Sequence, residues 1–210
     1  MTDKLQPRLR PYLQGNLDSL CGVYALINGI RWALRNDSVS AKGEHWEELF
    51  RILTNHAIKD RGHLELVSEG LSLYGMIALM HVARGHLREY HDIELSFRRP
   101  FALGRPTEPE EVVKRMSDHL RKPDTAVIAA VYGTLNHWCV TKQIDDRHVD
   151  LFDSDRLARL PKIAFQPKEF VRNVRRRAHI QAASVIIIKI SRGNDIDKKC
   201  VISKFCQRSD

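Results

Sequence analysis

Apolar residues early in the chain recur at helical spacing, and the clearest repeat begins at Cys21. The stretch 21–35 places an apolar residue at every third or fourth position, so one face of an α-helix would be buried. Asp18 or Ser19 is the expected N-cap of this helix. Its apolar stripe consists of Val23, Leu26, Ile27, Ile30 and Leu34.

Further segments of the first half also predict helices, and one segment predicts a short strand. Thr107-Glu108-Pro109-Glu110 is a capping-box pattern, which is typical of a helix N-terminus. The strand is expected over residues 92–98. The expected helices cover residues 44–59, 71–86 and 107–120.

After Pro123 the pattern changes to short apolar runs that are separated by polar turns, which is typical of strands. Residues 145–147, with the sequence Asp-Asp-Arg, form the expected tight turn between two of these strands. A helix is expected over residues 166–176. The expected strands cover residues 125–132, 136–144, 147–152 and 183–190.

Helices in the first half and antiparallel strands in the second indicate the α+β fold class. The chain has 210 residues, of which 43% are apolar, and this is enough for one domain with a sizeable core. We expect a single domain over residues 1–190, with a helical lobe at about 14–122 and a β lobe at about 123–190. Residues 191–210 are expected to form a basic tail or an added edge strand.

Composition narrows the possible function classes. The formal net charge of +8 permits contact with nucleic acid, anionic lipid or an acidic protein, and does not choose among them. Nucleic acid is the least favoured partner, because basic residues are not interleaved with aromatic ones and no glycine-rich phosphate loop is present. We expect no membrane span and no secretory signal, and therefore a cytoplasmic protein. Export as an effector without an N-terminal signal is the alternative.

The four cysteines show neither a disulfide framework nor zinc spacing. Cys200 and Cys206 are too far apart for a CxxC motif, and His81 and His86 do not form the i, i+4 pair of a zinc helix. The scattered histidines of the helical half are therefore interpreted as surface or packing residues.

Cys21 and His137 are the candidate nucleophile and base. Cys21 stands at the predicted start of a buried helix, where backbone N–H groups and the helix dipole favour the reactive thiolate. Gly22 leaves the approach to the thiol uncrowded. His137 begins a predicted strand after the turn-prone stretch Gly133–Asn136. A small buried hydrophobe and a structural histidine are the alternative interpretations.

Asp153 and Gln14 are the candidate groups that assist this pair. If residue 141 pairs with residue 149 across the turn, residue 137 lies opposite Asp153, whose carboxylate would orient the imidazole. Asp155 is the second choice, and a capping role for Asp153 is the alternative. The side-chain amide of Gln14 and the backbone N–H of Cys21 are the candidate oxyanion donors.

With Gln14, Cys21-Gly22, Asn136-His137 and Asp153-Ser154 in this order, the chain resembles the papain-like cysteine peptidase superfamily. Within it, the resemblance is to the bacteriocin-processing, C39-like type. It implies a papain-like fold, a Cys-His-Asp triad, a Gln-assisted oxyanion hole, and no metal or other cofactor. The chain differs from the type at Leu20, where aspartate is common, and by one extra residue between Gln14 and Cys21, which makes Asn16 an alternative oxyanion donor.

The resemblance implies a thiol-dependent hydrolase, in the first instance a cysteine peptidase that cleaves a peptide or isopeptide bond. A substrate with a Gly-Gly or ubiquitin-like C-terminal tail is one option, because small residues fit a narrow cleft. An acyltransferase, a deamidase or a transglutaminase-like effector would use the same triad. A non-catalytic, basic binding module is the hypothesis from another class.

Three further features have two interpretations each. The basic cluster Arg172–Arg177 is interpreted as a solvated helix face, and binding of phosphate or an acidic partner is the alternative. Cys139 is assigned to the core rather than to the candidate cleft. Trp138 is assigned either to packing or to the wall beside the base.

Overall fold

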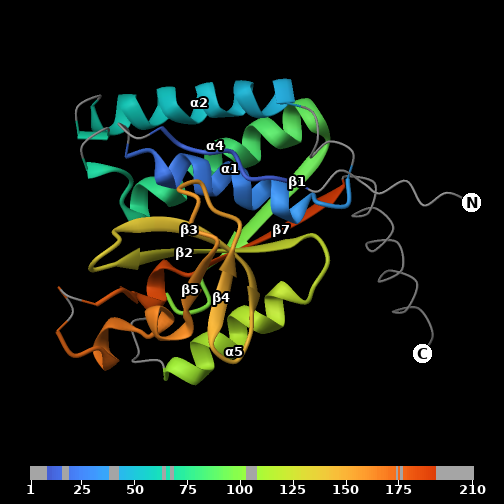
Figure 1. Ribbon diagram of the computed structural model, residues 1–210. Coiled ribbons are helices and arrows are strands. Elements are labelled where there is room, and N and C mark those ends of the chain that lie inside the picture. Colours follow the sequence, from blue (N-terminus) through green and yellow to red (C-terminus); the bar gives the residue numbers. More distant parts are fainter. Residues whose placement is uncertain are drawn as a thin grey trace, which may run out of the picture.

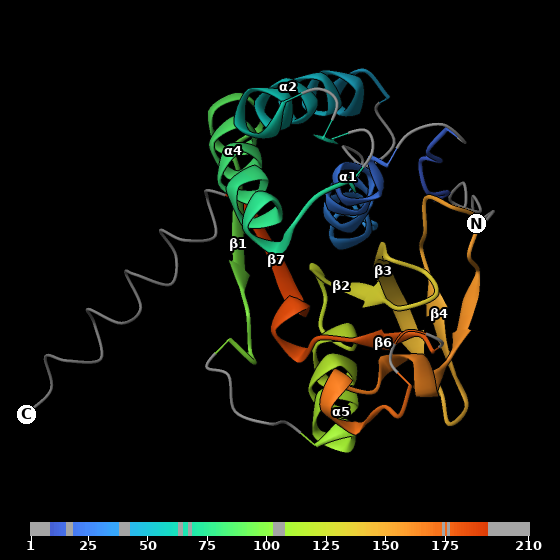
Figure 2. The ribbon, with the colours of Figure 1, turned by 90° about the vertical axis from the view of Figure 1, so that its left-hand side faces the viewer.

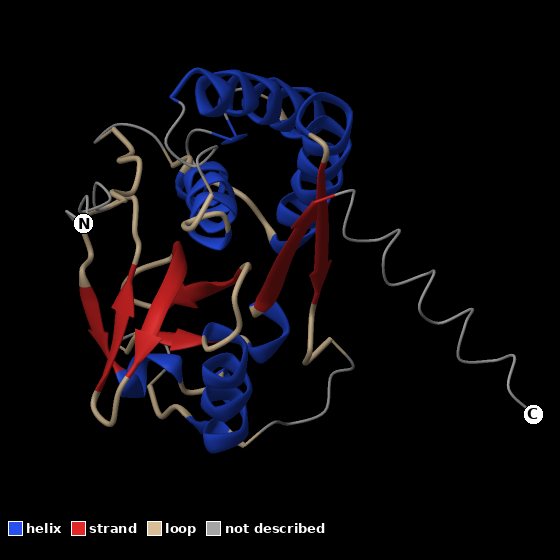
Figure 3. Cartoon of the chain, turned by 90° about the vertical axis from the view of Figure 1, so that its right-hand side faces the viewer, coloured by secondary structure: helices blue, strands red, loops and turns tan. Residues whose placement is uncertain are grey.

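The fold is an α+β arrangement in which one antiparallel sheet lies between two layers of helices (Figure 1). Figure 3 shows the sheet between the larger helical layer and the helical segments on its other face. This computed structural model describes residues 9–15, 19–37, 43–62, 65–66, 69–102, 108–173, 175 and 177–192.

The described residues contribute seven strands to the sheet, in the order β1-β7-β2-β3-β4-β5, with β6 paired to β2. All of these strand pairs are antiparallel. The last strand in the described part of the chain, β7, lies between β1 and β2, so the sheet joins the two halves of the sequence. The strands are β1 (Ile93–Arg98), β2 (Thr125–Tyr132), β3 (His137–Ile144), β4 (His148–Leu151), β5 (Arg159–Pro161), β6 (His179–Ile180) and β7 (Ile186–Arg192).

Helix α1 (Cys21–Ala33) lies against the middle of the sheet and is almost wholly buried. Helices α2 (Gly43–Arg61) and α4 (Leu73–His91) pack on α1, whereas α5 (Pro109–Leu120) packs on the opposite face of the sheet (Figure 2). At Gly29 the helix comes so close to the sheet that a Cβ atom would lie 2.8 Å from Cδ1 of Ile128. This close contact fixes the depth at which α1 sits on the strands.

The sequence predicts most of these elements to within a few residues, and one prediction is wrong. The expected helix over residues 166–176 does not form in the described residues of that range, 166–173 and 175, where the helical element is a 3-10 turn, η3 (Lys168–Phe170). The reason is Pro167, whose preceding residue Gln166 is held extended with a ψ of 135° and accepts a hydrogen bond from the N–H of Ile180. This segment therefore pairs with a strand instead of continuing as a helix.

Two predictions at helix N-termini also differ from the structure. The N-cap of α1 is Leu20, without a side-chain cap, and not Asp18 or Ser19. The N-cap of α5 is Glu108, and Pro109 is in its first turn. Asp18 and Thr107 lie outside the described residues.

The β3–β4 hairpin has a different register from the expected one. Thr141 pairs with Leu151 rather than with residue 149, and an irregularity follows between Thr141 and Gln143. The turn itself is where the sequence predicts it, because Oδ1 of Asp145 accepts hydrogen bonds from the N–H groups of Arg147 and His148. Next to the turn Ile144 pairs with Val149, so the centre of the hairpin lies further along the chain than the expected pairing of residue 141 with residue 149 requires.

The two expected lobes share one sheet. Strand β1 comes from the segment assigned to the helical lobe, and it forms an edge of the sheet beside β7. Helix α5 comes from the same segment and covers the face opposite α1. Of the expected tail, Ser191 and Arg192 end β7, and residues 193–210 lie outside the described part.

Candidate active site

Cys21 is the first residue of α1, with its side chain at the edge of the core and 8% exposed. Because α1 begins at Cys21, the sulfur lies near the positive end of the helix dipole. No side chain caps the helix at Leu20. The next residue has to be glycine for steric reasons. A Cβ atom on Gly22 would lie 2.9 Å from Cβ of Leu71 and 3.2 Å from Cδ1 of Trp138.

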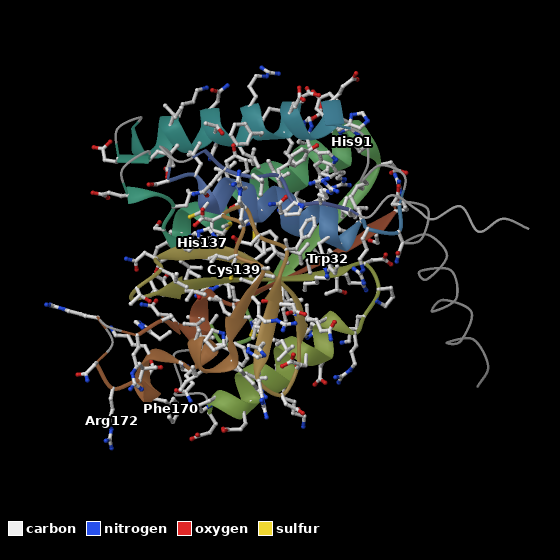
Figure 4. All side chains as sticks on the ribbon, in the orientation of Figure 1. Trp32, His91, His137, Cys139, Phe170 and Arg172 are labelled. Atoms are coloured by element: carbon white, nitrogen blue, oxygen red, sulfur yellow. The ribbon has the colours of Figure 1, made fainter. Side chains whose placement is uncertain are left out.

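His137 begins β3 and is 8% exposed. The preceding residue, Asn136, has a φ of +46°, a left-handed conformation that asparagine tolerates better than most residues. Strand alternation separates the next side chains, because Trp138 packs with the helices whereas Cys139 packs in the core on the α5 side. His137 lies at the end of the strand near α1 (Figure 4).

Asp153 follows β4 in a loop and is 4% exposed. Its neighbour Phe152 holds this loop in place: the ring packs 5.2 Å from that of Trp32 on α1, and the Phe152 N–H donates to the carbonyl oxygen of Val140. The Oδ2 atom of Asp153 accepts a hydrogen bond from the N–H of Asp155, which leaves Oδ1 for the histidine. Asp155, the second choice for this role, is exposed and contributes through its backbone.

His137 connects the other two groups. Its Nε2 lies 2.8 Å from Oδ1 of Asp153, and the side chain of Cys21 lies close enough to help raise the pKa of the imidazole. Because Nε2 is bound to the carboxylate, Nδ1 is the ring nitrogen that remains for an interaction with the sulfur. The expected contact between His137 and Asp153 is therefore present, although it crosses the strands diagonally rather than directly.

The electrostatics of this site favour a charged imidazole. Burial of the ring lowers the pKa of His137, but the hydrogen bonds and negative charges of Asp153 and Cys21 outweigh burial and raise that pKa from 6.5 to about 10. At neutral pH His137 is therefore an imidazolium beside a sulfur atom. Such a neighbour favours the thiolate form of a cysteine.

Gln14 lies beside Ser154, the residue after Asp153. Its N–H donates to the carbonyl oxygen of Ser154, and the Ser154 hydroxyl donates to Oε1 of Gln14 at 3.4 Å. The extended arm of residues 9–15 that carries Gln14 is attached to α1 by polar side chains. Arg31 Nη1 donates to the carbonyl oxygen of Arg10, and its guanidinium lies 3.9 Å above the ring of Tyr12.

Sequence reasoning missed the residues that position this arm and the carboxylate loop. Asn28 and Arg31 are polar residues within the apolar pattern of α1, and both are buried. A polar residue that interrupts an apolar helical stripe was the available signal. Nothing in the sequence shows that the two neighbours of Asp153 hold its loop in place. Phe152 does so by packing on Trp32, and Ser154 does so by hydrogen bonds with Gln14. Asn16, the alternative oxyanion donor, lies outside the described residues.

Cys139 and Trp138 are packing residues. Burial, with the charges of Asp153 and Cys21, raises the pKa of the Cys139 thiol well above its usual value, and the side chain is fully buried. Trp138 donates from Nε1 to the carbonyl oxygen of Leu71 and packs with Cys21 in the core beneath α1. The indole therefore supports the helix start that carries the candidate nucleophile.

Within the described ranges the protein has neither a metal site nor a membrane-spanning helix. There, no group of three or more histidine, cysteine, aspartate or glutamate side chains is arranged to hold a metal ion. Across that same part of the chain, the helices are all too short or too polar to cross a bilayer.

Comparisons with known proteins identify no relative. No family model matches the chain, and neither a curated protein nor a solved structure is similar enough to count as a match. The assignment of a function therefore depends on the geometry of this site.

Proposed function

We propose that this protein is a thiol-dependent hydrolase with a papain-like fold, in the first instance a cysteine peptidase. The observation that supports this proposal best is the position of His137. Its buried imidazole contacts a carboxylate through Nε2 at 2.8 Å, lies near the side chain of Cys21, and has a pKa that these two neighbours raise to about 10. A histidine with only a packing role does not need a sulfur and a carboxylate on its two sides.

In the proposed reaction the sulfur of Cys21 attacks a carbonyl carbon and forms a C–S bond. The carbonyl oxygen becomes an oxyanion, which accepts hydrogen bonds from the Cys21 N–H and the side-chain amide of Gln14. The intermediate collapses, the bond to the leaving group breaks, and that group takes the proton from His137. Water then attacks the thioester while His137 takes one of its protons, the C–S bond breaks, and the acid is released with the Cys21 thiolate and the His137 imidazolium restored.

The same groups carry out related reactions when the partners differ. An amine in place of water gives acyl transfer or transglutamination, and a side-chain amide as substrate gives deamidation. We propose a peptide or protein substrate, and a chain with a Gly-Gly or ubiquitin-like C-terminal tail is the first candidate to test.

The experiment is covalent trapping. Ubiquitin-like proteins and Gly-Gly-ending peptides with an electrophile in place of the C-terminal carboxylate are incubated with the protein, and mass spectrometry locates the adduct. We expect the adduct on Cys21, none with Cys21→Ala, and a rate lowered by several orders of magnitude with His137→Ala. Adducts that form equally on Cys200 or Cys206 would show that Cys21 is not activated, and the hypothesis of a non-catalytic module would replace the proposal.

A further inference from the structure

A groove on the other side of the sheet from α1 combines exposed apolar side chains with unpaired positive charges. It has a volume of about 540 Å³ and is lined by residues that include Pro161, Ile163, Phe170, Arg172 and Arg177. Figure 4 shows Phe170 and Arg172 far from His137, below the strands. The groove is thus separate from the candidate active site.

Two large apolar side chains in the lining of this groove are exposed to solvent. Ile163 is 56% exposed and Phe170 is 39% exposed, and both are large apolar residues in the same groove. Ile163 also lines a neighbouring groove of about 480 Å³ that extends along α5 past Pro109 and Val113. The two grooves together form a track with an apolar ridge in the middle, and such surfaces mark interaction sites.

The backbone holds this apolar surface in place. Phe170 is at the end of η3, where its N–H donates to the carbonyl oxygen of Pro167, and Pro167 is bridged to Ile180 of β6. Ile163 belongs to the 3-10 turn η2 (Lys162–Phe165), whose Phe165 is fully buried. The exposed side chains thus stand on turns that the core fixes.

The charges around the groove are almost all positive. Arg172, Arg175 and Arg177 are exposed, and within the described residues none of them has an ion-pair partner. Lys162 and Lys168 belong to the same two turns, Glu169 is an acidic residue beside them, and Glu110 lines the neighbouring groove. Elsewhere in the described part of the chain, some exposed arginines are ion-paired, as Arg115 is with Glu111. Unpaired cations around an apolar groove are complementary to an acidic ligand that also has apolar groups.

We propose that this groove docks an acidic segment of a partner protein, in which carboxylates alternate with large apolar side chains. The carboxylates would pair with Arg172, Arg175 and Arg177, while the apolar groups would cover Ile163 and Phe170. A peptide fits better than nucleic acid, because Phe170 is the one aromatic side chain among the described residues that line this groove, and stacking of successive bases needs several. The proposal does not depend on the proposed catalytic function.

The test begins with a library of random peptides that is displayed and selected on the full-length protein. Enriched peptides are synthesised with a fluorescein label, and their affinity is measured by fluorescence anisotropy. We expect acidic sequences with apolar residues, whose affinity falls at least about tenfold with Arg172→Glu/Arg177→Glu and also with Phe170→Ser. Raising the ionic strength should weaken binding as well, because the charges are exposed.

The matched control carries the same kinds of change on the helical side, Arg51→Glu on α2 and Tyr74→Ser on α4, where both side chains are exposed. It should bind the peptides as the wild type does. All variants should keep the wild-type melting temperature and the alkylation rate of Cys21, which excludes misfolding as the cause. Enrichment of neutral or basic peptides, or equal losses in groove and control variants, would overturn the proposal. The same holds if an oligothymidine or phosphatidylserine vesicles bind through Arg172 and Arg177 and no acidic peptide does.

Discussion

The side-chain amide of Asn28 makes two hydrogen bonds to the backbone of Tyr12, in the same way as the backbone of a neighbouring strand would. Its Oδ1 accepts from the Tyr12 N–H at 2.8 Å, and its Nδ2 donates to the Tyr12 carbonyl oxygen at 3.0 Å. Asn28 is completely buried in α1, so the helix that begins with Cys21 also holds the arm that carries Gln14. The candidate nucleophile and the candidate oxyanion donor are thus positioned by one helix.

Asn28→Leu should release this arm. The replacement leaves the N–H and carbonyl groups of Tyr12 without partners, which should lower the free energy of unfolding by about 1–3 kcal/mol in urea titrations. Acylation of Cys21 by p-nitrophenyl acetate should also slow, because Gln14 loses its position. If Asn28 acts through Gln14, adding Gln14→Ala to Asn28→Leu should slow acylation little further. Lost stability with unchanged acylation would contradict the proposed role of Gln14.

Ser154 should affect carbonyl chemistry and leave thiol reactivity unchanged. Its hydroxyl contacts Oε1 of Gln14, whereas the carboxylate beside it contacts His137. Ser154→Ala should therefore slow acylation by p-nitrophenyl acetate by about tenfold, less than loss of the oxyanion donor itself with Gln14→Ala. Alkylation by iodoacetamide forms no oxyanion and should stay at the wild-type rate.

Two further variants complete this comparison. Every protein in it, the reference included, also carries Cys200→Ser and Cys206→Ser. Ser154→Thr keeps the hydroxyl and should restore acylation, which a purely structural role would not require. Asp153→Asn should slow both reactions, because His137 loses the negative charge that keeps it protonated. Equal effects of Ser154→Ala on alkylation and acylation would refute the separate roles of these neighbours.

The sequence predicts the chemistry of the candidate site better than its geometry. Cys21 at a helix start and His137 at a strand start follow from local patterns, and the structure has both residues at those positions. The sequence predicts the contact between His137 and Asp153 from a strand register that the structure does not have. The contact forms because Phe152, with its hydrogen bond to Val140, positions the loop that carries Asp153. This is a tertiary effect.

The missed elements have a similar cause. Residues 166–176 have helical composition, but Pro167 and its bridge to Ile180 hold the start of this segment in a different conformation. The arm of residues 9–15 has no periodic pattern, and only the buried Asn28 and Arg31 reveal where it lies. Both cases depend on pairing between distant segments, which local propensity does not encode.

His137 should remain protonated well above neutral pH. In nitrogen-15 NMR spectra its ring should show two bound protons at pH 8 and titrate near pH 10, because its pKa is raised to about 10. In Asp153→Asn it should titrate at a lower pH, since a hydrogen bond and a negative charge are lost. The exposed His56 on α2 is the internal control. A ring of His137 that is neutral at pH 8 would remove the basis for an ion pair with Cys21.

The raised pKa of His137 also makes the free energy of unfolding depend on pH. The folded state binds this proton more tightly than the unfolded chain, in which histidine has a pKa of about 6.5. The stabilisation is therefore complete below about pH 6.5 and is lost as the pH rises towards 10. The free energy of unfolding should fall over this range in the wild type and fall less in His137→Gln. A wild type and variant with the same pH profile would show that His137 gains no proton affinity on folding.

Gly22→Ala should destabilise the protein at the helix start that carries Cys21. The added Cβ would lie 2.8 Å from Cδ1 and 2.9 Å from Cβ of Leu71, and the Cβ contact is not relieved by a change of rotamer. We expect a loss of about 1–3 kcal/mol in the free energy of unfolding, as is usual for an overpacked core. Gly85 on α4 is the matched control, because no atom lies within 4 Å of its added Cβ. Gly85→Ala should stabilise the protein by up to about 1 kcal/mol through helix propensity alone. If both alanines stabilise, α1 is not packed against Leu71 and Trp138 as the structure shows, and the position of Cys21 relative to His137 would have to be revised.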